Sequence, residues 1–530
     1  MNQLVPLENM GTVGLITDIP PYQLPPEAWS SGENIRFDDM SVEKAPGYRE
    51  VMEGLDFEPK HLETYQEYDE RGYYWIAFGD EKIASWVGGV WYDITPLTGL
   101  TSDTNRQWQT TKLGAVLIAT NGVDKPIWWP LNTVALASPD KKFEILEAWP
   151  DEWLNCQTIE GFKSFVIAGS LLRDDGIRMN RTVIWSDMTN QYTPPASWDP
   201  LDEYGDAGEY ELLETEGPAV HIQTLGESCI VYKSDSIYVM SFVGAPYMFS
   251  FRVLNPDVGI MCKNACAAFP GGHFFVGNDD CYVNNGQSIK PMLTQKIKTR
   301  LFNNIDGDSY RRTFCLTDHG NSEIWTCFPT VNSTYCNEAL VWNFVNNTFS
   351  MRTLPELSHA KYGVAKVISG DTWNDMTMEW DSSSERWGTG SYDNVVEHIV
   401  FAEPGVSKLY RNEAGNTEDG DFMYSWVERT GMDLGDPSSV KHIKSVWPKI
   451  TVSGSNTVNV WTGFQMSPDD PVTWNGPVKY DPDTMSKISV RTTGKLFGIR
   501  VESEEDMTWA LAGIEYELSP GGRRGSRVHV

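Results

Sequence analysis

Short apolar or aromatic stretches separated by Gly, Asn and Asp turns recur between residues 73 and 411, and this repetition constrains the fold most strongly. Residues 73–78, Tyr-Tyr-Trp-Ile-Ala-Phe, are followed by Gly-Asp, and residues 115–120, Ala-Val-Leu-Ile-Ala-Thr, by Asn-Gly. Stretches of this kind, joined by turn residues that tolerate positive φ, are typical of successive antiparallel hairpins. The chain is therefore predicted to be all-β.

The spacing of these repeats favours a β-propeller. Steps of roughly 40 to 60 residues are close to the length of one four-stranded blade with loop insertions. A pair of stacked β-sandwiches with the same turn residues is the alternative. The repeats begin near Tyr73, Leu113, Phe162, Ile222, His273, Arg312 and Tyr362.

Composition changes along the chain predict four regions. Residues 1–60 contain three Pro-Pro or Pro-Gly pairs and are predicted to form an extended N-terminal arm that packs on another domain. Residues 61–415 form the predicted propeller. Residues 416–520 alternate apolar and polar side chains, which predicts a β-sandwich platform domain with one solvated face on each sheet. Residues 521–530 form a flexible basic tail.

The chain carries 73 acidic and 42 basic residues, a formal net charge of −31. Such a surface repels a nucleic-acid backbone, so specific nucleic-acid binding is not expected. No stretch reaches the roughly 18 apolar residues of a membrane span, and the first 15 residues do not resemble a secretion signal. We therefore expect assembly in the cytoplasm, with the eight scattered cysteines as buried, reduced thiols.

Catalytic motifs are sparse, and the chain is predicted not to be an enzyme and to have no catalytic residues. The pair Gly494-Lys495 is followed by leucine, so it lacks the hydroxyl residue of a phosphate-binding loop. Neither His-Glu-x-x-His nor Gly-x-Ser-x-Gly occurs. No cofactor and no metal are predicted.

Several residue groups nevertheless offer alternatives. A zinc site would need Cys262 and Cys266 with Cys281 and His273, but buried thiols are the favoured interpretation. Glycan-active sites use paired carboxylates and aromatic platforms, whereas acidic pairs on turns and core tryptophans are the simpler explanation. The acidic pairs are Asp38-Asp39, Asp174-Asp175, Asp279-Asp280 and Asp469-Asp470; calcium-loop fragments occur at Asp306–Asp308 and Asp419–Asp421; the tryptophans are Trp128, Trp129, Trp149, Trp153, Trp373 and Trp380.

Helix is predicted at one place. Residues 291–305 begin with proline and place Leu293, Ile297 and Leu301 four residues apart, which predicts one apolar face packed against a sheet.

Two ends of the chain resemble structural proteins of short-tailed bacteriophages. The N-terminal resemblance lies in residues 24–38, LPPEAWSSGENIRFD, and 42–48, VEKAPGY. The C-terminal resemblance lies in residues 446–450, VWPKI, and 519–524, SPGGRR. With the β repeats between them, these segments resemble the tail nozzle, also called hub or tail stabilisation, family.

This resemblance implies a structural virion protein that forms the tail nozzle below the portal adaptor. It implies a homo-oligomeric ring of six subunits, each with a propeller, that contacts the head-to-tail adaptor and tail fibres or spikes. Double-stranded DNA would pass through the ring without specific binding during genome ejection. The alternative is a receptor-binding or glycan-cleaving tail protein, which predicts an aromatic pocket with convergent carboxylates.

Overall fold

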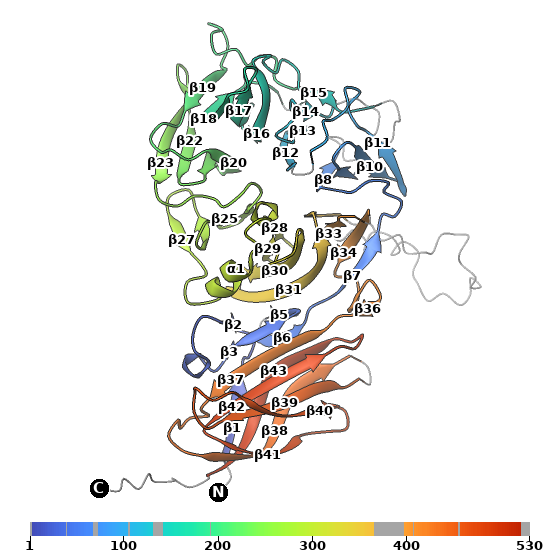
Figure 1. The fold of residues 1–530 in the computed structure, drawn as a ribbon, viewed down its shortest axis with the longest axis vertical. Helices are drawn as coiled ribbons and strands as arrows, with labels where there is room; N and C mark the ends of the chain where they lie inside the picture. The colour runs from blue at the N-terminus through green and yellow to red at the C-terminus, as the bar shows by residue number, and fades with distance from the viewer. Residues whose placement is uncertain are drawn as a thin grey trace, which may run out of the picture.

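The computed structural model describes residues 3–520 apart from residues 39, 67–72, 104–105, 131–140, 191, 365–396, 406 and 454–455. Asp39, Trp373, Trp380 and the predicted basic tail therefore lie outside the described residues. Within them the regular secondary structure is nearly all strand, which confirms the all-β prediction. A ring of small sheets stands above a pair of larger sheets that holds both chain ends (Figure 1).

Seven antiparallel sheets form the ring and are numbered as blades 1 to 7 in chain order. Blades 1 to 3 are β8 (His61–Gln66), β9 (Tyr73–Phe78), β10 (Ile83–Val87) and β11 (Val90–Asp93); β12 (Gln109–Leu113), β13 (Val116–Thr120), β14 (Ile127–Trp128) and β15 (Glu144–Ile145); and β16 (Trp153–Phe162), β17 (Phe165–Arg173), β18 (Arg178–Trp185) and β19 (Gly208–Glu211).

Blades 4 to 6 repeat the same order of four consecutive strands. They are β20 (Ala219–Leu225), β21 (Ser228–Lys233), β22 (Ile237–Gly244) and β23 (Met248–Asn255); β24 (Cys266–Phe269), β25 (Gly272–Val276), β26 (Cys281–Asn284) and β27 (Ile289–Pro291); and β28 (Phe314–Asp318), β29 (Glu323–Phe328), β30 (Cys336–Asn343) and β31 (Thr348–Leu357).

Blade 7 joins the two ends of the propeller sequence. Its strands β32 (His359–Val364), β33 (Glu397–Glu403) and β34 (Lys408–Asn412) are consecutive, but the fourth, β7 (Tyr48–Val51), precedes blade 1 in the chain. Antiparallel pairing of β7 with β34 closes the ring, and β35 (Thr417–Glu418) and β36 (Asp421–Phe422) extend this sheet outward. The sequence is therefore folded as a propeller rather than as stacked sandwiches.

The seven predicted repeat onsets mark the seven blades. Each lies in, or directly before, the first or second strand of a different blade; for example, Ile222 lies in β20 and His273 in β25. Second strands such as β13 are buried along their whole length, whereas outer strands such as β11 are not. Neighbouring blades cover both faces of the inner strands, which explains their continuous apolar sequences.

Two further sheets form what we call the two-sheet module. One has the order β41-β38-β43-β6-β5, with β1 also pairing with β43, and the other has the order β4-β37-β42-β39-β40. Their strands are β1 (Gln3–Glu8), β4 (Ser31–Glu33), β5 (Ile35–Asp38), β6 (Ser41–Lys44), β37 (Ser425–Met432), β38 (Lys441–Val452), β39 (Val458–Gln465), β40 (Thr473–Tyr480), β41 (Ile488–Gly494), β42 (Leu496–Ser503) and β43 (Trp509–Pro520).

Strand β41 alternates buried and exposed residues, as expected for a sheet with one solvated face. Buried residues of both sheets, including Val446 and Tyr516 of the first and Val427 and Val501 of the second, belong to one hydrophobic cluster. The predicted N-terminal arm supplies strands to three sheets. Strands β1, β5 and β6 belong to the first sheet of the module, β4 belongs to the second, and β7 belongs to blade 7.

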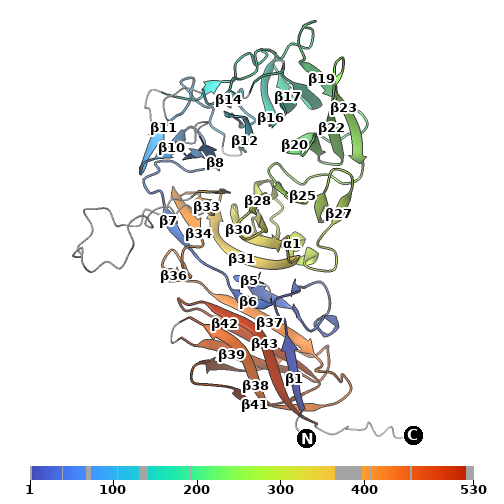
Figure 2. The same ribbon diagram turned by 180° about the vertical axis from the view of Figure 1, so that it is seen from behind.

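After β1, which lies in the module, the N-terminal segment up to residue 45 with strands β5 and β6 lies between the propeller and the rest of the module in both views (Figure 2). The cluster that contains the module core also contains Trp29 and Phe37 of this segment and Phe349 and Met351 of blade 6. The backbone amide of Asn34 donates to the carbonyl of Met351 at 3.0 Å. A short parallel pair, β2 (Gly14–Leu15) with β3 (Ala28–Trp29), and a 3₁₀ turn, η1 (Pro21–Gln23), complete the segment. The two parts of the molecule therefore share one continuous core.

The predicted helix over residues 291–305 is too long. Only α1 (Lys298–Asn304) is α-helical, because Pro291 ends strand β27 and the following residues form turns held by Asp280. The carboxylate of Asp280 accepts hydrogen bonds from the amide of Leu293 at 2.9 Å and the hydroxyl of Thr294 at 2.8 Å. The predicted apolar stripe is nevertheless buried, with Leu293, Ile297 and Leu301 fully inaccessible.

Candidate functional site

The innermost strands of the seven blades surround a central channel. These strands are β8, β12, β16, β20, β24, β28 and β32, and each is the first strand of its blade. Their side chains meet neighbours from adjacent blades, so polar residues at these positions can join the blades directly. The inner strands thus hold most of the buried polar groups discussed below.

Hydrogen bonds near the channel cross six of the seven boundaries between blades. Lys361 of blade 7 donates to Glu63 of blade 1, which also accepts from Thr110 of blade 2. At the boundary of blades 6 and 7 the rings of Phe314 and His359 lie 5.0 Å apart. The contacts are Lys361–Glu63 at 2.8 Å, Thr110–Glu63 at 2.5 Å, Thr111–Glu160 at 3.1 Å, Thr224 amide–Glu160 at 3.0 Å, His273–Thr224 carbonyl at 2.9 Å and Thr317–Ala268 carbonyl at 2.7 Å.

Glu63 is the charged centre of this network. Its side chain is 4% exposed, and burial alone would raise its pKa. The cations Lys361 and Lys112 and the hydroxyl of Thr110 outweigh burial and hold the pKa of Glu63 well below its usual value. Glu63 therefore stays ionised and links blades 7, 1 and 2.

The pKa of Glu160 is displaced in the opposite direction to that of Glu63. Burial raises the pKa of its carboxyl from 4.5 to about 7, and hydrogen bonds from Thr224 and Thr111 offset only part of this effect. Both of its oxygens accept hydrogen bonds, one from blade 2 and one from blade 4. Two carboxyl groups around one channel thus have pKa values displaced in opposite directions.

Four histidines near the channel are held neutral. Burial lowers the pKa of His61 and His221 to about 3, lowers that of His273 to about 4, and lowers that of His359 well below its usual value. The Nδ1 atom of His359 accepts a hydrogen bond from the amide of Leu62 at 3.1 Å, across the boundary between blades 7 and 1. These rings therefore act as neutral hydrogen-bonding groups near pH 7.

The channel encloses a cavity of about 340 Å³. Its walls come from the inner strands of all seven blades and combine carboxyl, imidazole, amide, hydroxyl and thiol groups. Two buried polar atoms on the wall, Nδ1 of His221 and Oε1 of Gln223, have no hydrogen-bond partner within the described residues. The polar lining includes Gln109, Thr110, Glu160, His221, Gln223, Cys266, Thr317, His319, Lys361 and Tyr362.

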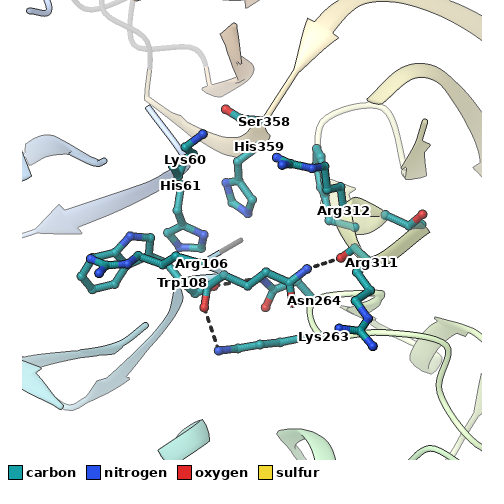
Figure 3. A pocket seen from close by; sticks show the side chains of 13 residues that line it. Lys60, His61, Arg106, Trp108, Lys263, Asn264, Arg311, Arg312, Ser358 and His359 are labelled. Atoms are coloured by element: carbon teal, nitrogen blue, oxygen red, sulfur yellow. Dashed lines mark hydrogen bonds between the residues drawn. The ribbon is translucent and has the colours of Figure 1, made fainter. Parts of the chain in front are cut away.

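One end of the channel is a smaller pocket of about 40 Å³, which we call the basic mouth (Figure 3). It is lined by residues that directly precede or begin the inner strands of blades 1, 2, 5, 6 and 7. The inner strands start on the same side of the ring, so these residues meet at one opening. The mouth and the larger cavity share His61, Asn264 and His359. The charged lining residues of the mouth are Lys60, Arg106, Lys263, Arg311 and Arg312.

Hydrogen bonds join the loops of the mouth across the opening. Lys263 donates to the carbonyl of Gln107 at 3.0 Å, and Asn264 donates to the carbonyl of Trp108 at 2.9 Å. The side-chain amide of Gln107 in turn donates to the carbonyl of Arg311. Burial lowers the pKa of Lys263 to about 7, so this ammonium group releases its proton unusually easily.

The predicted zinc alternative is not assembled within the described part of the chain, where no group of three or more His, Cys, Asp or Glu is arranged to hold a metal. Cys262, Cys266 and Cys281 are buried in the hydrophobic core, and the ring of His273 bonds to Tyr232 and to the carbonyl of Thr224. All eight cysteines are free thiols.

The predicted acidic pairs lie in separate turns rather than together. Asp175 pairs with Arg173, Asp279 accepts from Tyr282 at 2.6 Å, and Asp470 accepts from the amide of Ser467 at 2.9 Å. Asp306 and Asp419 likewise accept backbone amides, at 2.8 Å and 3.1 Å. The described tryptophans of the predicted sugar platform are buried in blade cores: Trp128, Trp129, Trp149 and Trp153.

Comparisons with known proteins add little to these observations. No family model and no curated protein matches the chain. Among solved structures, the WD40 domain of Neurospora crassa Pan2 matches with a TM-score of 0.37 at 6% identity, over 70% of this chain and 96% of that chain. BBS1N in complex with ARL6DN matches with a TM-score of 0.37 at 8% identity, over 69% and 97%. At this level of similarity the propeller is established by its own strand pairing.

No helix in the described ranges is long and apolar enough to cross a membrane. The basic mouth and the channel network were not predicted from the sequence. A signal for the mouth exists: each of its five basic residues precedes the first strand of a blade by one to three residues. That signal becomes visible only when the blade boundaries are known to the residue.

Proposed function

We propose that this chain is a structural virion protein that forms the tail nozzle of a short-tailed bacteriophage. In this proposal six copies form a ring below the portal adaptor, and the ring conducts the genome during ejection. The protein has no catalytic role; it offers attachment surfaces for the head-to-tail adaptor and for tail fibres or spikes. It is assembled in the host cytoplasm and resides in the virion tail.

One observation carries the proposal: parts of the segments that resemble nozzle proteins belong to one sheet although they come from opposite ends of the chain. Residues 35–38 and 42–44 contribute β5 and β6, and residues 446–450 lie in β38. Strand β43, which ends at Pro520, pairs with β38 on one side and with β6 on the other. A shared structural module is therefore the simplest reason for the resemblance at both ends.

We infer that the two-sheet module is a β-sandwich platform that binds the adaptor ring, with the propeller as the more distal part. The N-terminal strands that pack between them would fix the angle between platform and propeller. A rigid joint of this kind suits a tube whose subunits must hold a constant bore. The continuous hydrophobic cluster across the joint supports this assignment.

Charge supports a conduit role. Six copies of a chain with a net charge of −31 would surround the passage with a strongly negative potential. Few counterions would be released on contact with DNA, so the phosphate backbone would not be held by the wall. DNA would therefore pass without specific binding.

The location of the protein in particles tests this function. Purified virions should contain the chain by mass spectrometry, and antibodies against the propeller should label the tail in electron micrographs. Label on the capsid, or absence of the chain from infectious particles, would exclude a nozzle role.

A second candidate function is binding or cleavage of a glycan in the propeller channel. The observation that favours it is the opposite pKa displacement of Glu63 and Glu160, an arrangement that acid-base catalysts use. Both carboxylates, however, are tied to neighbouring blades by hydrogen bonds, as structural links are. Cleavage of host polysaccharide by the wild type that is lost in Glu160→Gln would favour the glycan function over the nozzle.

A further inference from the structure

The charge of the basic mouth is opposite to that of the chain. Acidic residues outnumber basic ones 73 to 42 in the sequence. The thirteen residues that line the mouth nevertheless include five Lys or Arg and no Asp or Glu. These five cations come from the loops before blades 1, 2, 5 and 6, so the fold itself brings them together.

Three of these cations have no carboxylate ion pair within the described residues: Lys263, Arg311 and Arg312. Lys263 contacts a backbone carbonyl, and the two guanidinium groups lie over the tyrosine rings of Tyr310 and Tyr335 at 5.8 Å and 4.5 Å. In contrast, Lys60 pairs with Glu58 at 2.6 Å, and Arg106 approaches Asp124 at 3.5 Å. Arg311 and Arg312 therefore bring positive charge to the mouth without an ion pair of their own, whereas burial makes the ammonium group of Lys263 easy to deprotonate near pH 7.

Two buried polar atoms of the mouth also have no hydrogen-bond partner in the described part of the chain. They are Nε of Arg106, whose residue is 6% exposed and which lies 3.7 Å from a carboxylate oxygen of Asp80, and Oγ1 of Thr313, whose residue is 1% exposed. Buried donors are normally satisfied, and an unsatisfied one costs about 1–3 kcal/mol. A ligand that accepts hydrogen bonds would remove this cost and neutralise the remaining charge.

We propose that the basic mouth binds a small tetrahedral oxyanion of the phosphate or sulfate class. Arginine side chains present several N–H groups in a planar fork and form charge-assisted hydrogen bonds to such anions. Donors from several blades line the same opening (Figure 3), and a tetrahedral anion offers more oxygens to such a set than a carboxylate does. The volume of about 40 Å³ is enough for a single small anion. The anion would tie the loops before blades 2, 5 and 6 together.

Calorimetry and thermal unfolding of the purified full-length chain test this site. Phosphate and sulfate should each raise the unfolding midpoint, because a ligand that binds only the folded state stabilises it. Chloride at the same ionic strength should not, which separates binding from charge screening. Equal midpoints in phosphate and chloride up to tens of millimolar would overturn the proposal.

Substitutions locate the binding. The double substitution Arg311→Ala and Arg312→Ala should raise the dissociation constant for phosphate at least tenfold, because it removes charge-assisted hydrogen bonds to the anion. The matched control is Arg252→Ala, an exposed arginine on β23, which should leave the constant unchanged. If the double variant does not fold, the exposed Arg311→Ala alone should still weaken binding. If the folded mouth variants bind phosphate as tightly as the wild type, the binding is an adventitious effect of the surface and the proposed site is refuted.

This inference does not depend on the nozzle function. The residues of the mouth come from one chain, so a monomer should bind the anion whether or not it assembles into rings.

Discussion

At the scale of single residues, buried charges join the N-terminal segment to the propeller. Arg36 of β5 contacts Glu323 of blade 6 at 2.9 Å and Glu413, directly after β34 of blade 7, at 2.6 Å. Burial opposes the charge of Arg36, but the two carboxylates outweigh it and raise its pKa. Next to this group, burial and the charge of Arg36 lower the pKa of Arg352 to about 10. The joint thus contains several interdependent charges with little access to water.

Arg36→Ala should destabilise the protein strongly. Removing one partner of a buried ion pair leaves an uncompensated charge and typically costs about 3–5 kcal/mol. Denaturant unfolding monitored by tryptophan fluorescence measures the loss. The matched control is Lys82→Ala, whose partner Asp56 also lies at 2.6 Å but on the surface, and it should have almost no effect. Equal effects of the two substitutions would contradict a structural role for the buried pair.

Glu160 should make stability fall as the pH rises. Its folded-state pKa of about 7 exceeds the usual 4.5, so between these pH values the folded state keeps a proton that the unfolded state releases. The resulting loss in the free energy of unfolding is absent below pH 4.5, grows up to pH 7 and is then constant, at roughly 3 kcal/mol. Glu160→Gln should therefore gain stability relative to the wild type between pH 5 and pH 8, in thermal unfolding scans. A difference that is independent of pH would show that Glu160 has an ordinary pKa.

At the scale of elements, the pairing of β7 with β34 closes the propeller. The backbone amide of Glu50 donates to the carboxylate of Asp419 at 3.1 Å, on the side of β7 away from β34. Backbone amides of successive residues in a strand point to opposite sides, so the amide of Arg49 points toward β34. Arg49→Pro should remove one hydrogen bond of this ladder, which costs about 1–3 kcal/mol.

Hydrogen exchange measures this effect locally. In Arg49→Pro, amides of β33 and β34 should exchange faster than those of blades 3 and 4, because the ring opens at blade 7. Arg49→Ala, which keeps the amide, should exchange like the wild type. Uniform acceleration over all blades would contradict local opening and indicate a single cooperative unit.

The sequence predicted the blades better than their closure. Continuous apolar strands such as Val116–Thr120 are visible in the sequence because neighbouring blades cover both of their faces. Strand β7 is not visible in this way, since Tyr48–Val51 is only partly buried and its partner β34 lies more than 350 residues later. The helix was overpredicted for a related reason: the carboxylate of Asp280 stabilises a turn at Leu293 that helical periodicity does not reveal.

The candidate site could not be predicted because it depends on the ring. Lys60, Arg106, Lys263 and the pair Arg311-Arg312 are distant from one another in the sequence. They meet only because every inner strand starts on the same side of the channel. Tryptophans such as Trp149 and Trp153 fill blade cores, as the favoured interpretation of the sequence predicted.

At the scale of the whole molecule, the first and last described strands, β1 and β43, pair in the two-sheet module, and the propeller is inserted between them in the sequence. The hydrophobic cluster that crosses the joint makes the two parts one body, so a surface that binds on the module would also orient the propeller. A ring of such subunits would have a defined bore. Its acidic composition would keep DNA from adhering to the wall.

Electron cryo-microscopy of the purified chain, alone and with the adaptor ring, tests the central claim most directly. We predict closed rings or short tubes of six subunits, with the two-sheet module against the adaptor and the propellers distal. A chain that remains monomeric and does not join adaptor rings, or a bore lined with lysine and arginine, would contradict the nozzle function.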